Sequence, residues 1–247
     1  MPRPAPTVSR ETFAPAHRLV ERAAGMGIAV TPEVAGALAA LLDRIALEPQ
    51  NLTAIETIGD GVDRHLADSL AGLSVGELAR ATACVDLGSG SGFPGLALAA
   101  ARPRMAVTLV ESERRKADWL RRAAADFPNV RVVADRSEHL ASAERERYPV
   151  ATARALGPLP VTLELAAPLV SVGGAVLVWR GDRADAGAEA AAARAARELG
   201  LEPCEPVRSS PFPGARRRLQ LFRKVDLTPS RFPRRPGRAA SRPLGGG

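Results

Sequence analysis

The sequence is poor in the residues that build covalently linked or metal-held domains. Cys84 and Cys204 are the only cysteines among 247 residues, which excludes a disulfide framework and a zinc site with four sulfur ligands. The chain has three histidines, and no two of them have the spacing of metal ligands. The sequence therefore implies no metal, and function must come from other residue types.

Long apolar segments are also lacking. The most continuous one in the C-terminal half, residues 173–179, is far shorter than the ~20 residues that are needed to span a bilayer. Residues 1–7 alternate proline with small side chains and lack the apolar core of a secretory signal. We therefore expect a cytoplasmic protein with no membrane-spanning segment.

The rest of the composition is ordinary for a folded domain. Hydrophobic residues make up 46% and charged residues 25% of the chain, so it can bury a sizeable core. Its 247 residues are a little over one and a half times the ~150 residues of a common domain. One large domain with appendages is the expected organisation, and we expect a monomer.

Lysine is scarce, and arginine carries the positive charge. The net charge is +7, and only Lys116 and Lys224 are lysines. From Gly214 onward ten basic residues oppose Asp226 alone, which gives +9, whereas the preceding residues have 24 basic and 26 acidic side chains. A near-neutral body with a basic end is typical of a protein that binds a nucleic-acid backbone. An arginine-rich composition that serves solubility is the alternative.

The N-terminal third reads as helical. Residues 1–9 are rich in proline and are expected to be disordered. Helices are predicted over about 10–25 and 32–48, and a third apolar periodicity runs through 61–80. We therefore expect an N-terminal helical region, residues 10–80, that packs on the core.

The pattern then changes to short apolar runs that alternate with helical stretches. The runs are separated by enough residues for crossover helices, which predicts parallel strands in an open sheet that is covered on both faces. These strands are expected at 83–87, 107–110, 130–133, 150–153 and 175–179. Two more, near 206–209 and 218–222, are joined by too few residues for a helix and should pair antiparallel.

The prediction is an α/β fold: a Rossmann-like, doubly wound sheet that is mostly parallel and has an antiparallel last strand. It should occupy residues 81–225. The segment 226–247 consists mainly of proline, arginine and glycine and is expected to be a flexible basic tail.

The most informative segment is residues 85–95, which read VDLGSGSGFPG. A strand ends in an acid, glycines alternate, and Pro94 suits the first turn of a helix. Residues 90–95 also match the G-x-G-x-x-G pattern of dinucleotide sites. In the dinucleotide fingerprint, however, the first glycine of the pattern makes the turn that leaves the strand. Here that place is taken by Gly88, which lies before the matching segment and follows Asp86. This register favours S-adenosylmethionine, with backbone contacts at Gly88 and Gly90, and a glycine turn that only packs helix on sheet is the remaining alternative.

Further acids follow the next two strands. Glu111 ends the second strand, where a carboxylate can accept both hydroxyls of a ribose. Ser137 and Glu138 follow the third strand, in the loop that covers the adenine of a nucleoside bound to such a sheet. Without a ligand, these residues would be helix-terminal acids and a turn.

The sequence limits the atom that could accept a methyl group. A pyrimidine C5 acceptor requires a nucleophilic cysteine, yet Cys84 lies within a strand and Cys204 in a distal loop. An exocyclic adenine amine is usually met by a Pro-Pro-aromatic loop after the fourth strand, and residues 153–158 read ARALGP instead. A purine N7 has a free lone pair and needs no base, so alignment and exclusion of water can supply the acceleration.

Two further polar residues are candidates for the site. Arg154 ends the fourth strand, where a cation can clamp a carboxylate or an RNA phosphate. An ion pair with a neighbouring acid is its structural alternative. His65 is the one histidine in a polar, motif-like setting, although a lone histidine is more often structural.

Several segments together resemble one family. They are NLTAI at 51–55, Arg64-His65 followed by Asp68-Ser69-Leu70, DLGSG at 86–90, GFPG at 92–95, and Arg154-Ala155. In order and spacing they resemble the glucose-inhibited division protein B family, over roughly residues 15–225. The sequence departs from the family pattern at Arg180-Gly181, where Lys-Gly is expected. The planar guanidinium group of arginine keeps the positive charge there but has a different hydrogen-bonding geometry from the ammonium group of lysine.

The resemblance implies a 16S ribosomal RNA guanine-N7 methyltransferase with a class I S-adenosylmethionine fold. Its cofactor residues map to Gly88, Phe93, Ser137, Glu138 and Arg154. The guanine pocket is implied to be framed by Arg154, Asn51, His65 and Asp68. The partner is then expected to be 16S ribosomal RNA or the small ribosomal subunit. The basic tail after Val225 lies at the edge of the resemblance, and we expect it to be an added RNA anchor.

Three other functions stay open on the residues alone. A nicotinamide-dependent oxidoreductase would use the glycines of residues 90–95. A non-catalytic RNA-binding factor would keep the fold and bind RNA in a salt-dependent way. A small-molecule methyltransferase would use the same cofactor, and the basic C-terminal end disfavours it.

Overall fold

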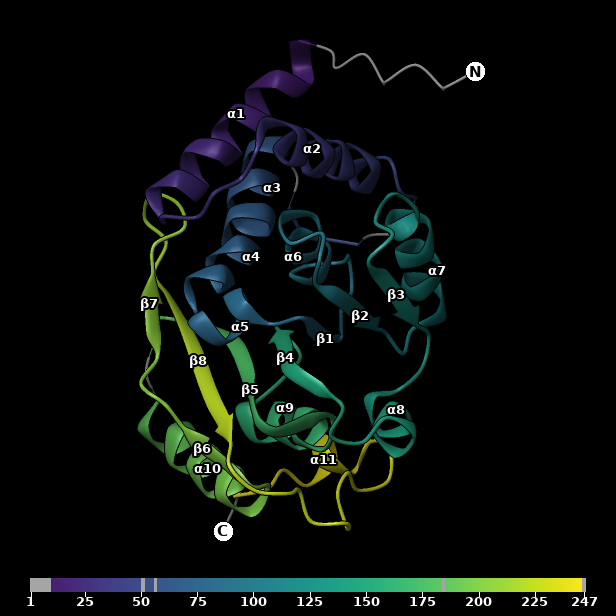
Figure 1. Ribbon diagram of the computed structural model, residues 1–247, viewed down its shortest axis with the longest axis vertical. Coiled ribbons are helices and arrows are strands. Elements are labelled where there is room, and N and C mark those ends of the chain that lie inside the picture. Colours follow the sequence, from purple (N-terminus) through teal and green to yellow (C-terminus); the bar gives the residue numbers. More distant parts are fainter. Residues whose placement is uncertain (1–9, 50–51, 56, 184, 246–247) are drawn as a thin grey trace.

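The computed structural model describes residues 10–49, 52–55, 57–183 and 185–245. Helices precede a sheet whose strands alternate with further helices, as the sequence predicts (Figure 1). The expected disorder of residues 1–9 falls outside the described residues, and so does Asn51.

The N-terminal region is helical but more broken than the sequence suggests. It holds α1 (Arg10–Gly25), α2 (Pro32–Ala46), α3 (Ile58–Gly61), a π-helical turn (Val62–Ala67), α4 (Asp68–Leu70), a 3-10 turn (Ala71–Ser74) and α5 (Gly76–Arg80). Thr31 caps α2 by accepting from the amide of Val34, and Pro32 occupies the first helical position, so the predicted start of this helix at residue 32 is confirmed. The apolar periodicity over 61–80 falls on several short helical elements, because the π turn and the 3-10 turn each change the hydrogen-bond spacing.

The remaining chain supplies the sheet and the helices that cover it. The strands are β1 (Ala83–Leu87), β2 (Ala106–Val110), β3 (Val130–Val133), β4 (Tyr148–Arg154), β5 (Val170–Gly181), β6 (Leu201–Pro203), β7 (Val207–Ser209) and β8 (Arg217–Lys224). The helices are α6 (Gly95–Ala101), α7 (Arg114–Ala123), α8 (Ser137–Ala143), α9 (Leu159–Ala166), α10 (Ala186–Glu198) and α11 (Arg238–Ser241), with 3-10 turns at Ala124–Asp126 and Ala167–Leu169.

The sheet order is β3-β2-β1-β4-β5-β8-β6, and β7 also pairs with β8. β1 to β5 are parallel, while β8 runs antiparallel to β5, β6 and β7. The predicted doubly wound sheet is therefore confirmed, together with the antiparallel pairing of its last strands. The strand order reverses between β1 and β4, and this switch point is where ligands bind in such sheets.

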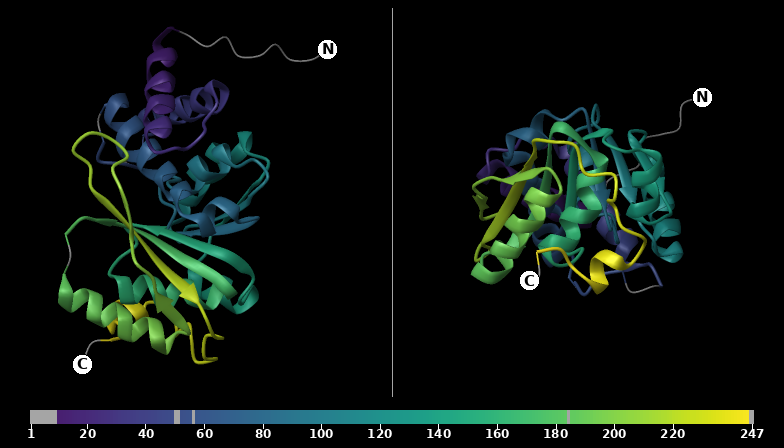
Figure 2. Two further views of the ribbon diagram at one scale, coloured as in Figure 1. Left: turned by 60° about the vertical axis from the view of Figure 1, so that its left-hand side comes forward. Right: turned by 90° about the horizontal axis from the view of Figure 1, so that it is seen from below.

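Two apolar clusters lie on opposite faces of the sheet. In β5, Leu177 and Trp179 belong to the cluster that includes α1, α2, α6 and α7, whereas Val176 and Val178 belong to the cluster that includes α8, α9 and α10. This alternation follows from the two-residue period of a strand. Figures 1 and 2 show the N-terminal helices at one end of the molecule and α10 with the C-terminal segment at the other.

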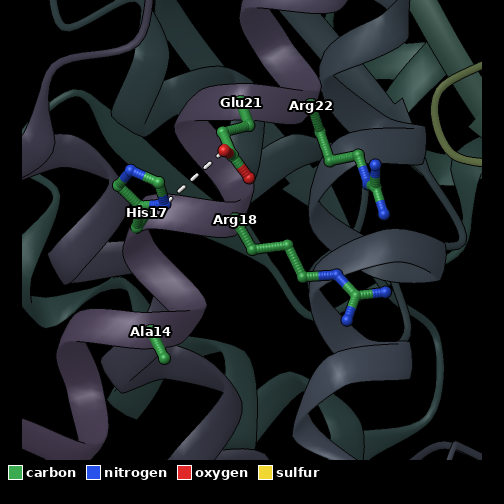
Figure 3. Close-up of a pocket in the computed structure, with 5 residues that line it drawn as sticks. All are labelled: Ala14, His17, Arg18, Glu21 and Arg22. Carbon is green, nitrogen blue, oxygen red and sulfur yellow. Dashed lines mark ion pairs between the residues drawn. The ribbon is translucent and has the colours of Figure 1, made fainter.

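Asp63 holds α1 against the π turn. Its carboxylate is buried and pairs with Arg18 and with Arg22, whose Nε lies 3.0 Å from Oδ1. Figure 3 shows both arginines turned away from His17 and Glu21, which form their own 3.8 Å ion pair around a shallow hollow on α1. This hollow is formed by α1 residues alone and is not part of the sheet edge where a ligand is expected.

The C-terminal segment departs from the prediction. Residues 226–245 are folded against the sheet-covering helices, so the expectation of a flexible tail from residue 226 was wrong for these residues. Phe232 is 2% exposed and lies in the second apolar cluster, and Arg234 pairs with Glu164 of α9. Buried Lys224 donates to the carbonyl of Ala167 at 3.1 Å and to Thr228, and burial lowers its pKa.

Candidate functional site

The glycine loop after β1 has a backbone that only glycine adopts easily. Gly88, Gly90 and Gly92 have φ values of 65°, 55° and 107°. A Cβ at Gly88 would lie 2.6 Å from Cδ1 of Leu156, so the loop passes close to the segment after β4. The amides of Gly88 and Ser89 donate to the carbonyl of Val110, at 2.9 and 3.1 Å. The end of β1 is thereby tied to the end of β2.

Asp86 braces this loop from inside. The residue is fully buried, its Oδ1 accepts from Thr152 at 2.8 Å, and its Oδ2 accepts from the amide of Gly95 at 3.3 Å. Burial raises the pKa of this carboxyl group to about 6, against the lowering effect of its hydrogen bonds. Both carboxylate oxygens thus accept from protein groups inside the fold, which fixes the glycine loop to β4 and to the start of α6.

Glu111 lies at the carboxyl end of β2, and 8% of it is exposed. Its Oε2 accepts from the amide of Gly90 at 3.0 Å, and its Oε1 accepts from the amide of Glu113 at 2.8 Å. Each carboxylate oxygen has a second lone pair, so these bonds orient the group and leave acceptor capacity for hydroxyls. Its role with a ribose stays a prediction.

A cavity of about 180 Å³ opens beside these residues. Its lining includes Gly88 from the glycine loop, Val110 from β2, and Ser137 and Glu138 from the start of α8. Ser137 and Glu138 are 8% and 7% exposed. Three strand ends thus converge on one hollow, as expected for a nucleoside site at the switch point. The missing Cβ at Gly88 lets the side chain of Leu156, which also lines the cavity, pack against the glycine loop.

Arg154 ends β4 on the other side of the glycine loop. Its Nη1 donates to Oδ2 of Asp68 and to the carbonyl of Arg64, each at 3.0 Å, and its Nη2 lies 3.3 Å from Nδ1 of His65. The guanidinium also lies over the ring of Phe93, 6.0 Å from its centroid. The ion pair that the sequence left as an alternative is present, and it belongs to the same cluster as the other candidate residues.

His65 joins this cluster as a neutral ring. Because arginine only donates, Nδ1 of His65 accepts from Arg154, and Nε2 therefore carries the proton and donates to Oγ1 of Thr53 at 2.7 Å. Burial and the charge of Arg154 lower its pKa to about 4. The ring stacks on Phe93, with centroids 4.9 Å apart and an angle of 15°.

Asp68 links Arg154 to a residue that sequence reasoning missed. Its Oδ1 accepts from Nε of Arg217 at 2.6 Å, and its backbone carbonyl accepts from the indole of Trp179 at 2.8 Å. Arg217 begins β8 and lies over the ring of Phe212 in the β7–β8 connection. The sequence signal was the basic run 216–218, but nothing in it distinguished Arg217 from its neighbours.

The structure thus brings most of the predicted site residues to one edge of the sheet. Arg154, His65, Asp68 and Phe93 form one cluster, and Gly88, Ser137 and Glu138 line the neighbouring hollow. Glu111 directly follows Val110 of that lining and accepts from the amide of Gly90. Asn51 lies outside the described residues. Thr53, Trp179 and Arg217 were not foreseen.

Strain accompanies the end of β4. Ala155 has a φ of 56°, which is unusual for a residue with a Cβ and costs of order 1 kcal/mol. It follows Arg154 directly, so the backbone turns sharply just where the guanidinium enters the cluster.

Within the described ranges, no three His, Cys, Asp or Glu side chains are grouped so that they could hold a metal ion. The same residues contain no helix with the length and apolar character that crossing a bilayer requires.

Comparison with known proteins gives consistent matches. Residues 37–202 match the family described as rRNA small subunit methyltransferase G. A protein of that name from Chloroflexus aggregans is 40% identical over 92% of this chain and 97% of its own length. One from Deinococcus radiodurans is 37% identical over 89% of this chain and 88% of its own length. A crystal structure of a mutant of MtNAS aligns over 88% of this chain and 78% of that chain, with 13% identity and a TM-score of 0.54, a likeness in fold alone.

Proposed function

Because the chain belongs to the rRNA small subunit methyltransferase G family, we propose that it methylates N7 of a guanine in 16S ribosomal RNA, using S-adenosylmethionine. The cofactor supplies an electrophilic methyl group on a sulfonium. The glycine loop, Glu111 and the hollow beside them offer close backbone approach, a hydroxyl acceptor and a cavity for a nucleoside, so the residues present fit this group.

The choice of acceptor is supported by one observation, namely that His65 and Asp68 are already committed as hydrogen-bond partners. The Nδ1 lone pair of His65 is used by Arg154, and its pKa of about 4 leaves the ring a weak base. Asp68 is 4% exposed and accepts from two guanidinium groups. A guanine N7 carries no proton, so transfer to it needs alignment and exclusion of water but no base.

The roles of the residues follow from their positions. Gly88, Gly90, Phe93, Glu111, Ser137 and Glu138 are proposed to bind the cofactor, and Arg154, His65, Asp68 and Asn51 to frame the guanine. Arg154 is also proposed to contact the cofactor, because its guanidinium lies over the ring of Phe93, which is itself a proposed cofactor residue. Asp68 and His65 hold the guanidinium in place from two directions, so that its fork is aimed before the RNA arrives.

The RNA is proposed to approach over the hairpin of β7 and β8. Arg208 and Arg216 are 76% and 80% exposed there, and Arg217 connects the hairpin to Asp68. Exposed arginines can bind phosphates bidentately. We propose that the protein acts as a cytoplasmic monomer on the small subunit or its RNA.

Methyl transfer to RNA tests this function directly. The purified chain is mixed with radiolabelled S-adenosylmethionine and either small ribosomal subunits or naked 16S RNA from cells that lack the gene. Label should enter the RNA, and borohydride and aniline treatment should cleave it at the modified guanine. Label in RNA without cleavage would contradict the N7 assignment. Binding of NADH without binding of S-adenosylmethionine would contradict the function as a whole.

Removing the Glu111 carboxylate should weaken cofactor binding. Glu111→Ala should raise the Kd of S-adenosylhomocysteine by a factor that corresponds to about 1 to 3 kcal/mol, because a charged acceptor of hydroxyl groups is lost. Titration calorimetry measures the change. Glu113→Ala is the matched control, since Glu113 is exposed and pairs with Lys116 instead. Equal affinity of Glu111→Ala and the unchanged chain would remove Glu111 from the ribose site.

A further inference from the structure

The hollow beside the glycine loop has a wall that comes from the far end of the chain. Gly237, Ala239 and Ala240 line it together with Ser137, Glu138 and residues of α9. The amide of Gly237 donates to Oε1 of Glu138 at 3.1 Å. The C-terminal segment therefore contacts the same carboxylate that the cofactor site is proposed to use.

The cavity wall, residues 237–240, is anchored to the fold by residues that precede it in the sequence. Phe232 is buried, and its carbonyl accepts from Nη1 of Arg145 at 2.6 Å. Nε of Arg234 donates to Oε1 of Glu164 at 2.7 Å, and Glu164 on α9 is only 1% exposed. A buried carboxylate with a charged partner is costly to separate from it, so this anchor is strong.

The wall is also anchored by residues that follow it in the sequence. Nη2 of Arg234 donates to the carbonyl of Arg242 at 2.8 Å, and Nε of Arg194 on α10 donates to the carbonyl of Gly245 at 3.1 Å. Residues 237–240 thus cross the mouth of the cavity between two fixed points, and Figure 1 shows α11 on the same side of the sheet as α8 and α9. A segment held at both ends needs little ordering when a ligand binds.

The chemistry of the cavity suits a purine ring. Val110, Leu156 and Val161 provide apolar side chains, and the methyl groups of Ala239 and Ala240 lie among the lining residues from the C-terminal segment. Glu138 adds a carboxylate, whose Oε1 accepts a hydrogen bond from the amide of Gly237. An adenine needs apolar contacts for its ring and an acceptor for its 6-amino group, and this lining contains apolar side chains and a carboxylate.

We propose that residues 237–240 form the outer wall of the adenine pocket and limit which substituents on the adenine can be bound. The inference rests on the proposed placement of the cofactor in this hollow. It adds a role for a segment that the sequence marks only as basic: its arginines tie the segment to the fold, and its glycine and alanines shape the pocket.

A chain that ends at Pro236 provides the first test. This truncation keeps Phe232 and the pairing of Arg234 with Glu164 but removes the wall. The Kd of S-adenosylhomocysteine, measured by calorimetry, should rise at least about tenfold, because the apolar contacts of Ala239 and Ala240 are lost and Glu138 loses the Gly237 amide that orients it. An analogue with a benzyl group on the 6-amino nitrogen should bind the truncated chain better, relative to S-adenosylhomocysteine, than it binds the full chain.

A point variant serves in case the truncated chain does not fold. Ala240→Trp in the full chain places a large ring at the mouth of the cavity and should raise the same Kd at least about tenfold with little change in the melting temperature of the free protein. Arg235→Trp is the matched control, because Arg235 is exposed and does not line the cavity. Its Kd should equal that of the unchanged chain.

The outcomes separate this inference from the function on which it rests. Binding by the full chain, with unchanged Kd and unchanged analogue preference in the truncated chain and in Ala240→Trp, would overturn the wall and leave the methyltransferase assignment intact. Absence of binding to the full chain would overturn the placement of the cofactor itself.

Discussion

Replacing Arg154 with alanine is expected to lower kcat/KM for methyl transfer at least about a hundredfold, which corresponds to about 2.7 kcal/mol of lost transition-state binding. The guanidinium is 16% exposed and is aimed by Asp68, His65 and the carbonyl of Arg64. Its loss removes a preorganised cation at the junction between the proposed cofactor and guanine sites. The measurement is steady-state methylation of small ribosomal subunits.

The fold of the Arg154→Ala variant should persist, because Asp68 keeps its ion pair with Arg217. A melting curve by circular dichroism tests this. Arg154→Lys should recover only part of the activity, since an ammonium cannot reproduce the fork. Arg121→Ala is the control, because Arg121 lies on α7 and pairs with Asp118 on an exposed surface. Normal turnover by Arg154→Ala would exclude the residue from the reaction.

The neutral state of His65 should appear as a pH dependence of stability. Its folded pKa, about 4, lies below the ordinary 6.5, so between these values the unfolded chain binds the proton more readily. The contribution of His65 is complete above pH 6.5 and is lost as the pH falls to 4, by about 3 kcal/mol in total. The free energy of unfolding of His65→Gln, measured relative to that of the unchanged chain, should therefore rise by about 3 kcal/mol from pH 7 to pH 4.

The comparison between two chains is necessary because Asp86 acts in the opposite direction. Its pKa is raised from 3.8 to about 6, so its burial becomes less costly as the pH falls through the same window. The slope of the unchanged chain alone would mix the two groups. His17→Gln serves as the control, since the side chain of His17 is 63% exposed. If urea unfolding gave the same difference between His65→Gln and the unchanged chain at both pH values, His65 would not be held neutral by the fold.

The sheet was predictable because its signals are local. Each of the five parallel strands is a short apolar run followed by enough residues for a crossover, and Thr31 with Pro32 marks the start of α2. The strand β6 was missed, since it has three residues and two of them, Glu202 and Pro203, are exposed. Such a strand exists only through its pairing with β8.

The parts of the site that were missed depend on contacts between distant residues. Arg217 meets Asp68 across 149 positions of sequence, and Arg234 meets Glu164 across 70. Composition made the last segment read as flexible, because proline, arginine and glycine rarely build a core. One buried phenylalanine and a few directed hydrogen bonds order it instead, and a pattern of residue types contains no information on where their partners lie.

The position of β8 has a consequence for how the protein is made. A ribosome synthesises β8 after every other strand, yet this strand lies between β5 and β6 and also pairs with β7. Until residue 224 has emerged, a nascent chain would therefore leave one side of β5 without its neighbour, and open edges of this kind invite pairing between chains. A chain that is interrupted before this point would be prone to aggregate rather than merely inactive.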